Sequence, residues 1–124
     1  MIIGLGTDII EVERVAEKIR KNNGFAGKIF STDEIRLCEA STNRYQNYAG
    51  RFAAKEAFLK ATGQGLNLTH DLCLIEVLPD PSGKPFIKLN GILEQYQRER
   101  NWKNIHVSIS HIKEAATAVV IIES

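Results

Sequence analysis

Cysteines and long apolar runs are scarce in this chain of 124 residues, and each shortage excludes a class of protein. Two cysteines, Cys38 and Cys73, are too few for a disulfide scaffold and form no C-x-x-C pair indicating zinc, so we expect reduced thiols. No apolar stretch approaches the roughly 20 residues that a membrane-spanning helix needs. Acidic residues follow the apolar start at once, without a basic leader, so we expect no signal peptide and a cytoplasmic protein.

An excess of charge of one sign is also missing. The chain holds 16 basic and 15 acidic residues, and its net charge of +1 gives no indication of nucleic-acid binding. A hydrophobic fraction of 44% and a charged fraction of 25% are ordinary for a soluble globular protein. Because no repeat, low-complexity tract or linker interrupts residues 1–124, we predict one domain.

Hydrophobic periodicity predicts the order strand, three helices, two strands, helix, two strands. The predicted strands cover 2–10, 72–78, 85–89, 105–110 and 116–122, and the predicted helices cover 11–22, 31–38, 44–62 and 92–100. Ser31 and Glu34 have the spacing of a capping box at a helix start. Since the later strands come in hairpin pairs, the predicted fold class is α+β, with a mostly antiparallel sheet packed against a long central helix.

Asp8 is the first residue that could carry chemistry. It lies near the end of an apolar strand, where a carboxylate is costly unless it is exposed, paired or bound to a cation. The position alone is explained by a strand-end or helix-capping residue. The functional alternative is a ligand for a hard cation.

The long predicted helix carries a second group of charges, in the stretch 51–60. Glu56 and Lys60 share a face, and Lys55 lies beside Glu56, about 100° round the helix. Taken alone, they read as a solvated ion-pair face worth roughly 0.3–0.5 kcal/mol per pair. The alternative is a metal-binding carboxylate with cations nearby for phosphates, which phosphoryl transfer needs. Gly63 and Gly65 follow directly, as a helix C-cap or as a loop that resembles phosphate-binding loops.

Two further positions are less specific. Ser110 and His111 are adjacent in a strand and point to opposite faces, so they make a poor nucleophile–base pair, although His111 alone could bind a phosphate. On the first predicted helix, three cations lie off the apolar stripe, as a solvated face or as a docking face for an acidic partner. These cations are Arg14, Lys18 and Lys21.

Together and in this order, the motifs resemble the holo-acyl-carrier-protein synthase family, the short bacterial phosphopantetheinyl transferases. The matching segments are Gly6-Thr7-Asp8, residues 51–60, residues 63–65, Gly83-Lys84-Pro85 and residues 108–111. The resemblance covers essentially the whole chain. It implies magnesium-dependent transfer of 4′-phosphopantetheine from coenzyme A to a serine of apo-acyl carrier protein, giving adenosine 3′,5′-bisphosphate and supporting fatty acid biosynthesis.

The resemblance also implies roles for individual residues. Asp8 and Glu56 would bind Mg²⁺, with Lys60 as the third catalytic residue and Glu56 taking the serine proton directly or through water. A homotrimer with active sites between subunits is implied as well. Coenzyme A would meet Arg51, Lys60, Gly63, Gly65 and His111, and acyl carrier protein would meet Arg14, Lys18 and Lys21.

A non-catalytic module that binds coenzyme A or a nucleotide is the main alternative, and a phosphate-ester hydrolase or a purely structural protein are others. A binder of a polyanion gains nothing from two carboxylates without a metal. The pairing of Asp8 with Glu56 therefore favours the transferase.

Overall fold

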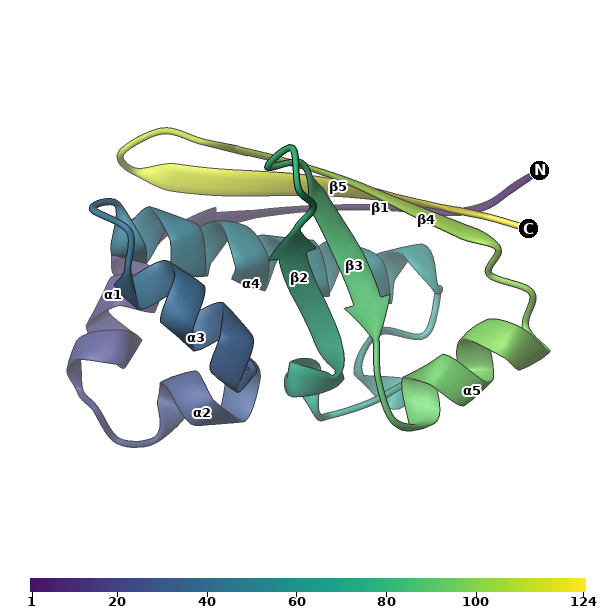
Figure 1. Ribbon diagram of the computed structural model, residues 1–124, viewed down its shortest axis with the longest axis horizontal. Coiled ribbons are helices and arrows are strands. Elements are labelled where there is room, and N and C mark those ends of the chain that lie inside the picture. The colour runs from purple at the N-terminus through teal and green to yellow at the C-terminus, as the bar shows by residue number, and fades with distance from the viewer.

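The computed structural model describes residues 1–124 as an α+β fold, as predicted (Figure 1). Its strands are β1 (Ile2–Glu11), β2 (Ile75–Pro79), β3 (Pro85–Leu89), β4 (Asn104–His111) and β5 (Ala115–Glu123). Its helices are α1 (Val12–Arg20), α2 (Phe25–Ile29), α3 (Thr32–Glu39), α4 (Arg44–Ala61) and α5 (Ile92–Glu99). Two short 3₁₀ turns cover Gly65–Asn67 and Leu72–Leu74. None of the helices combines the length and apolar composition needed to cross a membrane.

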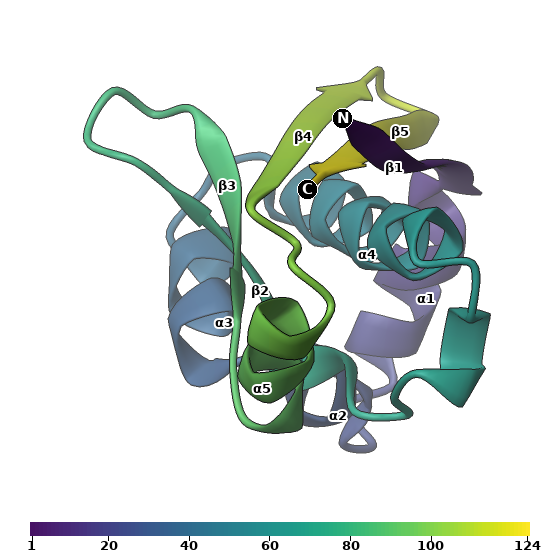
Figure 2. The same ribbon diagram turned by 90° about the vertical axis from the view of Figure 1, so that its right-hand side faces the viewer.

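Strands β1, β5 and β4 form an antiparallel sheet in that order, and α4 runs along one face of it (Figures 1 and 2). The predicted hairpin between the last two strands is confirmed. In this register Asp8 lies opposite Ala118, which lies opposite Ile109, and His111 lies opposite Ala116. Asp8 and His111 are therefore on the two edge strands of the sheet.

Two glycines allow α4 to approach β1 closely. A Cβ atom at Gly6 would lie 1.9 Å from the carbonyl oxygen of Ala57, and one at Gly4 would lie 2.1 Å from that of Ala61. The facing stripe of α4 is made of alanines, and Ala53 and Ala57 have no exposed surface. The two glycines thus mark a close approach of the two backbones, because neither residue carries a side chain that would separate them.

The opposite face of the sheet carries exposed apolar side chains. Leu5 and Ile9 are 66% and 73% exposed, and Val119 of the central strand is 38% exposed. They alternate along the strands with the residues that face α4, as the two-residue period of a strand requires. No helix or strand of the chain covers this face of the sheet (Figure 2).

The remaining elements form a layer on the far side of α4. The hairpin of β2 and β3 is separate from the main sheet and stands beside it with α5 (Figure 2). One core lies here, where Phe58 of α4 meets Trp102 edge to face with ring centroids 5.7 Å apart. A second core joins α1, α2 and α3 to the first half of α4 around Phe30 and Tyr48, whose ring centroids are 4.9 Å apart. Helix α4 thus contributes to both cores.

The capping box predicted at the start of α3 is confirmed. Ser31 Oγ accepts a hydrogen bond from the amide of Glu34 at 3.2 Å, and Glu34 Oε1 accepts one from the amide of Ser31 at 3.0 Å. At the other end of α4, Thr62 is the C-cap and Gly63 follows with φ of +75°. A residue without Cβ is favoured in that conformation, so Gly63 ends the helix as predicted.

Two local predictions were wrong. Helix α2 was not predicted, because five residues give no helical periodicity of their own. The strand predicted from residue 72 begins at Ile75, because Leu72–Leu74 form a 3₁₀ turn. The Asp71 side chain caps that turn by accepting a hydrogen bond from the amide of Cys73 at 3.1 Å.

Candidate active site

Strand β1 directs Asp8 towards α4. Asp8 lies on the same face as Gly4 and Gly6, and its side chain is only 16% exposed. The backbone at this position is fixed by the neighbouring strand, because Thr117 Oγ1 donates a hydrogen bond of 2.8 Å to the carbonyl oxygen of Asp8. Asp8 is therefore a largely shielded carboxylate at the edge of the sheet.

Helix α4 brings Glu56 and Lys60 to the same place, one helical turn apart. Lys60 Nζ donates hydrogen bonds of 3.0 Å to Asp8 Oδ1 and of 3.0 Å to the carbonyl oxygen of Thr7. Burial raises the pKa of the Glu56 carboxyl, the Asp8 carboxylate raises it further, and Lys60 lowers it. The three residues predicted to be catalytic thus lie together, although 52 residues separate Asp8 from Lys60 in the chain.

This arrangement suits a divalent cation that also binds a substrate. Two carboxylates that repel each other gain stability from a shared cation. No group of three or more His, Cys, Asp or Glu side chains is present, so the protein supplies at most two ligands of this kind here. Mg²⁺ is held in this way, by one or two carboxylates with phosphate oxygens and water completing its coordination. The donor set therefore fits Mg²⁺ bound together with a phosphate-containing substrate.

Lys55, next to Glu56, is not available to a substrate. Its side chain has no exposed surface, and Nζ donates hydrogen bonds to Glu34 Oε1 at 2.7 Å and to the carbonyl oxygens of Leu72 and Ile75 at 2.9 and 2.6 Å. Burial lowers the pKa of Lys55, and the charge of Glu34 opposes that shift. The cation expected to help hold phosphates is instead a buried anchor between α4, α3 and the turn before β2.

The sequence-based predictions missed Glu34 as the buried ion-pair partner of Lys55. Besides its part in the capping box and its ion pair with Lys55, Glu34 Oε2 accepts a hydrogen bond of 3.0 Å from the amide of Val77. The S-x-x-E motif predicted the cap but gave no sign of a partner 21 residues away.

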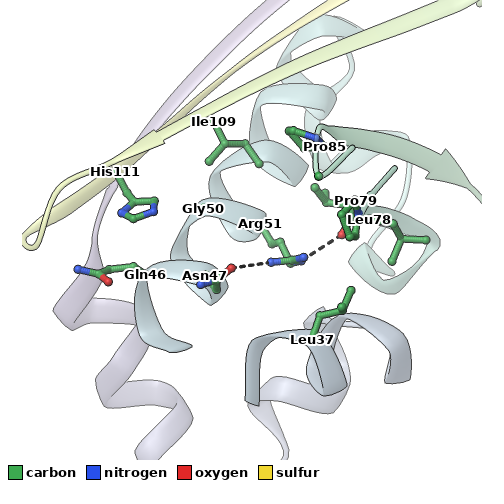
Figure 3. A pocket seen from close by; sticks show the side chains of 12 residues that line it. Leu37, Gln46, Asn47, Gly50, Arg51, Leu78, Pro79, Pro85, Ile109 and His111 are labelled. Carbon is green, nitrogen blue, oxygen red and sulfur yellow. Dashed lines mark hydrogen bonds between the residues drawn. The ribbon is translucent and has the colours of Figure 1, made fainter. Parts of the chain in front are cut away.

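Arg51 and His111 line a cavity of about 380 Å³ on the other side of α4 (Figure 3). Arg51 Nε donates a hydrogen bond of 3.0 Å to the carbonyl oxygen of Val77, and Nη1 donates one of 3.3 Å to Asn47 Oδ1. These bonds direct the guanidinium towards the β2–β3 hairpin. Gly83, from the predicted G-K-P turn, also lines the cavity.

The predicted site is therefore divided in a single chain. Arg51 and Glu56 are five residues apart on α4, which places them about 140° apart around the helix axis. Asp8 and His111 stand on opposite edge strands of the sheet, whose axes are two strand spacings or about 10 Å apart, and His111 is a further two residues along the strand direction. Helix α4 lies between these two groups of site residues and packs directly against the sheet, where Ala53 has no exposed surface.

The glycine loop and the basic face lie where the sequence predicted. Gly63 and Gly65 follow α4 with positive φ angles of 75° and 55° and with open space around both. The three cations predicted to form a docking face are exposed, two on α1 and one at its C-cap, opposite a buried stripe of Val12, Val15, Ala16 and Ile19. These exposed residues are Arg14, Lys18 and Lys21.

Solved structures show the class of protein to which this geometry belongs. The holo-[acyl-carrier-protein] synthase of Neisseria meningitidis superposes with a TM-score of 0.92 at 31% sequence identity over 100% of both chains. The holo-(acyl-carrier-protein) synthase of Bacillus anthracis, in complex with CoA (3′,5′-ADP), superposes with a TM-score of 0.81 at 35% identity. The match covers 100% of this chain and 98% of that one. The fold is that of these synthases.

Sequence comparison gives the family. The curated holo-[acyl-carrier-protein] synthase of Halothermothrix orenii is 40% identical over 122 residues, which cover 98% of this chain and 97% of that protein. The family model for the 4′-phosphopantetheinyl transferase superfamily matches residues 4–120. The chain belongs to the 4′-phosphopantetheinyl transferase superfamily.

Proposed function

We propose that this protein transfers the 4′-phosphopantetheine group of coenzyme A to a serine of apo-acyl carrier protein. The products are holo-acyl carrier protein and adenosine 3′,5′-bisphosphate. The observation that carries the proposal is the convergence of Asp8 and Glu56, with Lys60 bonded to Asp8, at one edge of the sheet. Relatives covering nearly the whole chain are synthases of this kind, and one of them is a complex with coenzyme A.

Asp8 and Glu56 would hold Mg²⁺, which when bound would neutralise charge on the pyrophosphate of coenzyme A. Glu56 would accept the proton of the attacking serine hydroxyl, directly or through a water molecule. Lys60 is 55% exposed and can turn from Asp8 towards a phosphate, where its charge stabilises the departing adenosine bisphosphate. The nucleophile belongs to the partner, so no serine of this chain takes part.

We further propose that coenzyme A is bound by Lys60, Gly63 and Gly65 of one subunit and by Arg51 and His111 of its neighbour. In a single chain α4 separates these two sets of residues. A homotrimer whose active sites lie between subunits would bring them together. The exposed apolar face of the main sheet supports association, because apolar side chains such as Leu5 and Ile9 gain stability when another copy covers them.

The basic face of α1 is the proposed dock for acyl carrier protein. Arg14, Lys18 and Lys21 are exposed on the side of the helix away from its buried stripe. Such a face steers an acidic partner and fixes its orientation more than it adds affinity. These substrates place the reaction in the cytoplasm, where it supplies holo-acyl carrier protein for fatty acid biosynthesis.

Intact-mass spectrometry of apo-acyl carrier protein tests the proposal. The carrier protein is incubated with the enzyme, coenzyme A and Mg²⁺, with and without a chelator. We expect a gain of roughly 340 Da, the mass of one phosphopantetheine group, that the chelator abolishes. An unchanged carrier mass, with coenzyme A still bound in a separate assay, would instead favour the non-catalytic binding module.

A further inference from the structure

The contact between β1 and α4 has a regular spacing that ends at Asp8. Gly4 faces Ala61 and Gly6 faces Ala57, so a step of two residues along the strand matches a step of four residues along the helix. These steps are about 6.6 Å and about 6.0 Å long, which keeps the two backbones in register. The next step along β1 is Asp8. Its position over α4 is therefore fixed by the two glycine contacts that precede it.

These contacts leave no room for a side chain. A Cβ atom at Gly6 would lie 1.9 Å from the carbonyl oxygen of Ala57 and 2.6 Å from the amide nitrogen of Ala61. An ordinary Cβ contact begins at 3.4 Å, so β1 and α4 would have to separate by about 1.5 Å. The obstructing atoms belong to the backbone of a helix and cannot turn aside as a flexible side chain would.

Such a displacement matters because Asp8 is on β1 and Glu56 is on α4, so separating the two elements changes the distance between these carboxylates. Mg²⁺ requires nearly ideal octahedral geometry with oxygen ligands at about 2.0–2.1 Å, so two protein ligands tolerate little change in separation. We propose that Gly4 and Gly6 are positioning residues, which set the distance between Asp8 on β1 and Glu56 on α4 that lets both bind one Mg²⁺. This inference rests on the function proposed above.

Metal binding can be measured directly with Mn²⁺, which accepts the same oxygen ligands and is detected by electron paramagnetic resonance. The full-length protein with coenzyme A is titrated with Mn²⁺ as wild type, Gly6→Ala and Gly27→Ala. We expect Gly6→Ala to weaken Mn²⁺ binding roughly tenfold or more, as is typical when the support of a metal ligand is disturbed. Gly27→Ala is the matched control, because a Cβ atom at Gly27 in α2 meets nothing within 4 Å and binding should be unchanged.

A rescue experiment separates positioning from general damage. Asp8→Glu adds one carbon–carbon bond of about 1.5 Å, close to the displacement expected in Gly6→Ala. In the wild-type background this longer side chain should weaken Mn²⁺ binding. In the Gly6→Ala background it should restore part of what Gly6→Ala loses, a reversal of sign that a purely structural role of Gly6 does not produce.

The outcomes separate this inference from the proposed function. If Gly6→Ala binds Mn²⁺ as tightly as the wild type, or if Asp8→Glu does not rescue it, the positioning role is overturned. The proposed function still stands in that case, provided that the wild-type protein transfers the group to acyl carrier protein. A wild-type protein that neither binds Mn²⁺ nor transfers the group overturns both. Should Gly6→Ala lack the wild-type circular dichroism spectrum, Gly4→Ala replaces it under the same criteria, since its contact is at Ala61, the last residue of α4.

Discussion

Replacing Lys55 by methionine should destabilise the protein far more than replacing an exposed lysine. Neither Lys55 nor Glu34 has an exposed side chain, so Lys55→Met leaves a buried carboxylate without its counter-charge. Breaking such a pair costs about 3–5 kcal/mol, against a total stability of about 6–19 kcal/mol for a chain of this length. At about 4 °C per kcal/mol, the melting temperature should fall by about 12–20 °C.

The assay is thermal unfolding followed by circular dichroism, with Lys28→Met as the control. Lys28 is exposed on α2 and forms no ion pair, so its replacement should change stability by at most about 0.5 kcal/mol. Glu34→Gln combined with Lys55→Met removes both charges and keeps the capping-box acceptor, although its single oxygen no longer serves the amide of Val77. This double variant should still recover about 1 kcal/mol, because no uncompensated charge remains buried. A Lys55→Met protein that melts within about 4 °C of wild type would refute the reasoning.

Three other changes test separate parts of the proposal. Arg14→Glu with Lys21→Glu should raise KM for acyl carrier protein far more than KM for coenzyme A. If neither KM changes, acyl carrier protein does not dock on this face of α1. Lys60→Ala and His111→Ala should each be nearly inactive, yet mixed subunits should regain about a quarter of wild-type activity by random assortment, whereas a site within one chain regains none. Gly63→Ala should lower the free energy of unfolding in urea by about 1 kcal/mol, because a residue with a Cβ atom is disfavoured at a φ of +75°. An unchanged urea midpoint would contradict this.

Local signals in the sequence predicted most of the elements. The capping box of Ser31 and Glu34 acts through residues three positions apart, and the stripe on α1 repeats within three turns, so neither depends on distant contacts. The turn at Leu72–Leu74 has a local cap from Asp71 but also depends on a distant contact. Lys55 bonds to the carbonyl oxygens of Leu72 and Ile75, and no pattern within that apolar run could reveal a donor on another helix.

Prediction of the site was limited in the same way, because local patterns do not reveal contacts between distant residues. Family resemblance, rather than periodicity, linked Asp8 to Glu56 and Lys60, because Asp8 and Lys60 are 52 residues apart in the chain. Lys55 and Lys60 are both lysines on α4, but one is fully buried and the other is mostly exposed. That difference comes from the elements that cover each side chain: Lys55 is enclosed by α3 and the turn before β2, whereas Lys60 reaches only the edge strand β1. The division of the site by α4 also became visible only in three dimensions.

The most direct test of the central claim is the transfer reaction of Asp8→Ala and Glu56→Ala with apo-acyl carrier protein, coenzyme A and saturating Mg²⁺. Intact mass measures the product, and circular dichroism checks that each variant is folded. We expect both variants to keep the wild-type spectrum and to leave the carrier protein unmodified, while the wild type converts it only when Mg²⁺ is present. Near-normal turnover by either folded variant would contradict the assignment of these two carboxylates to a catalytic metal site.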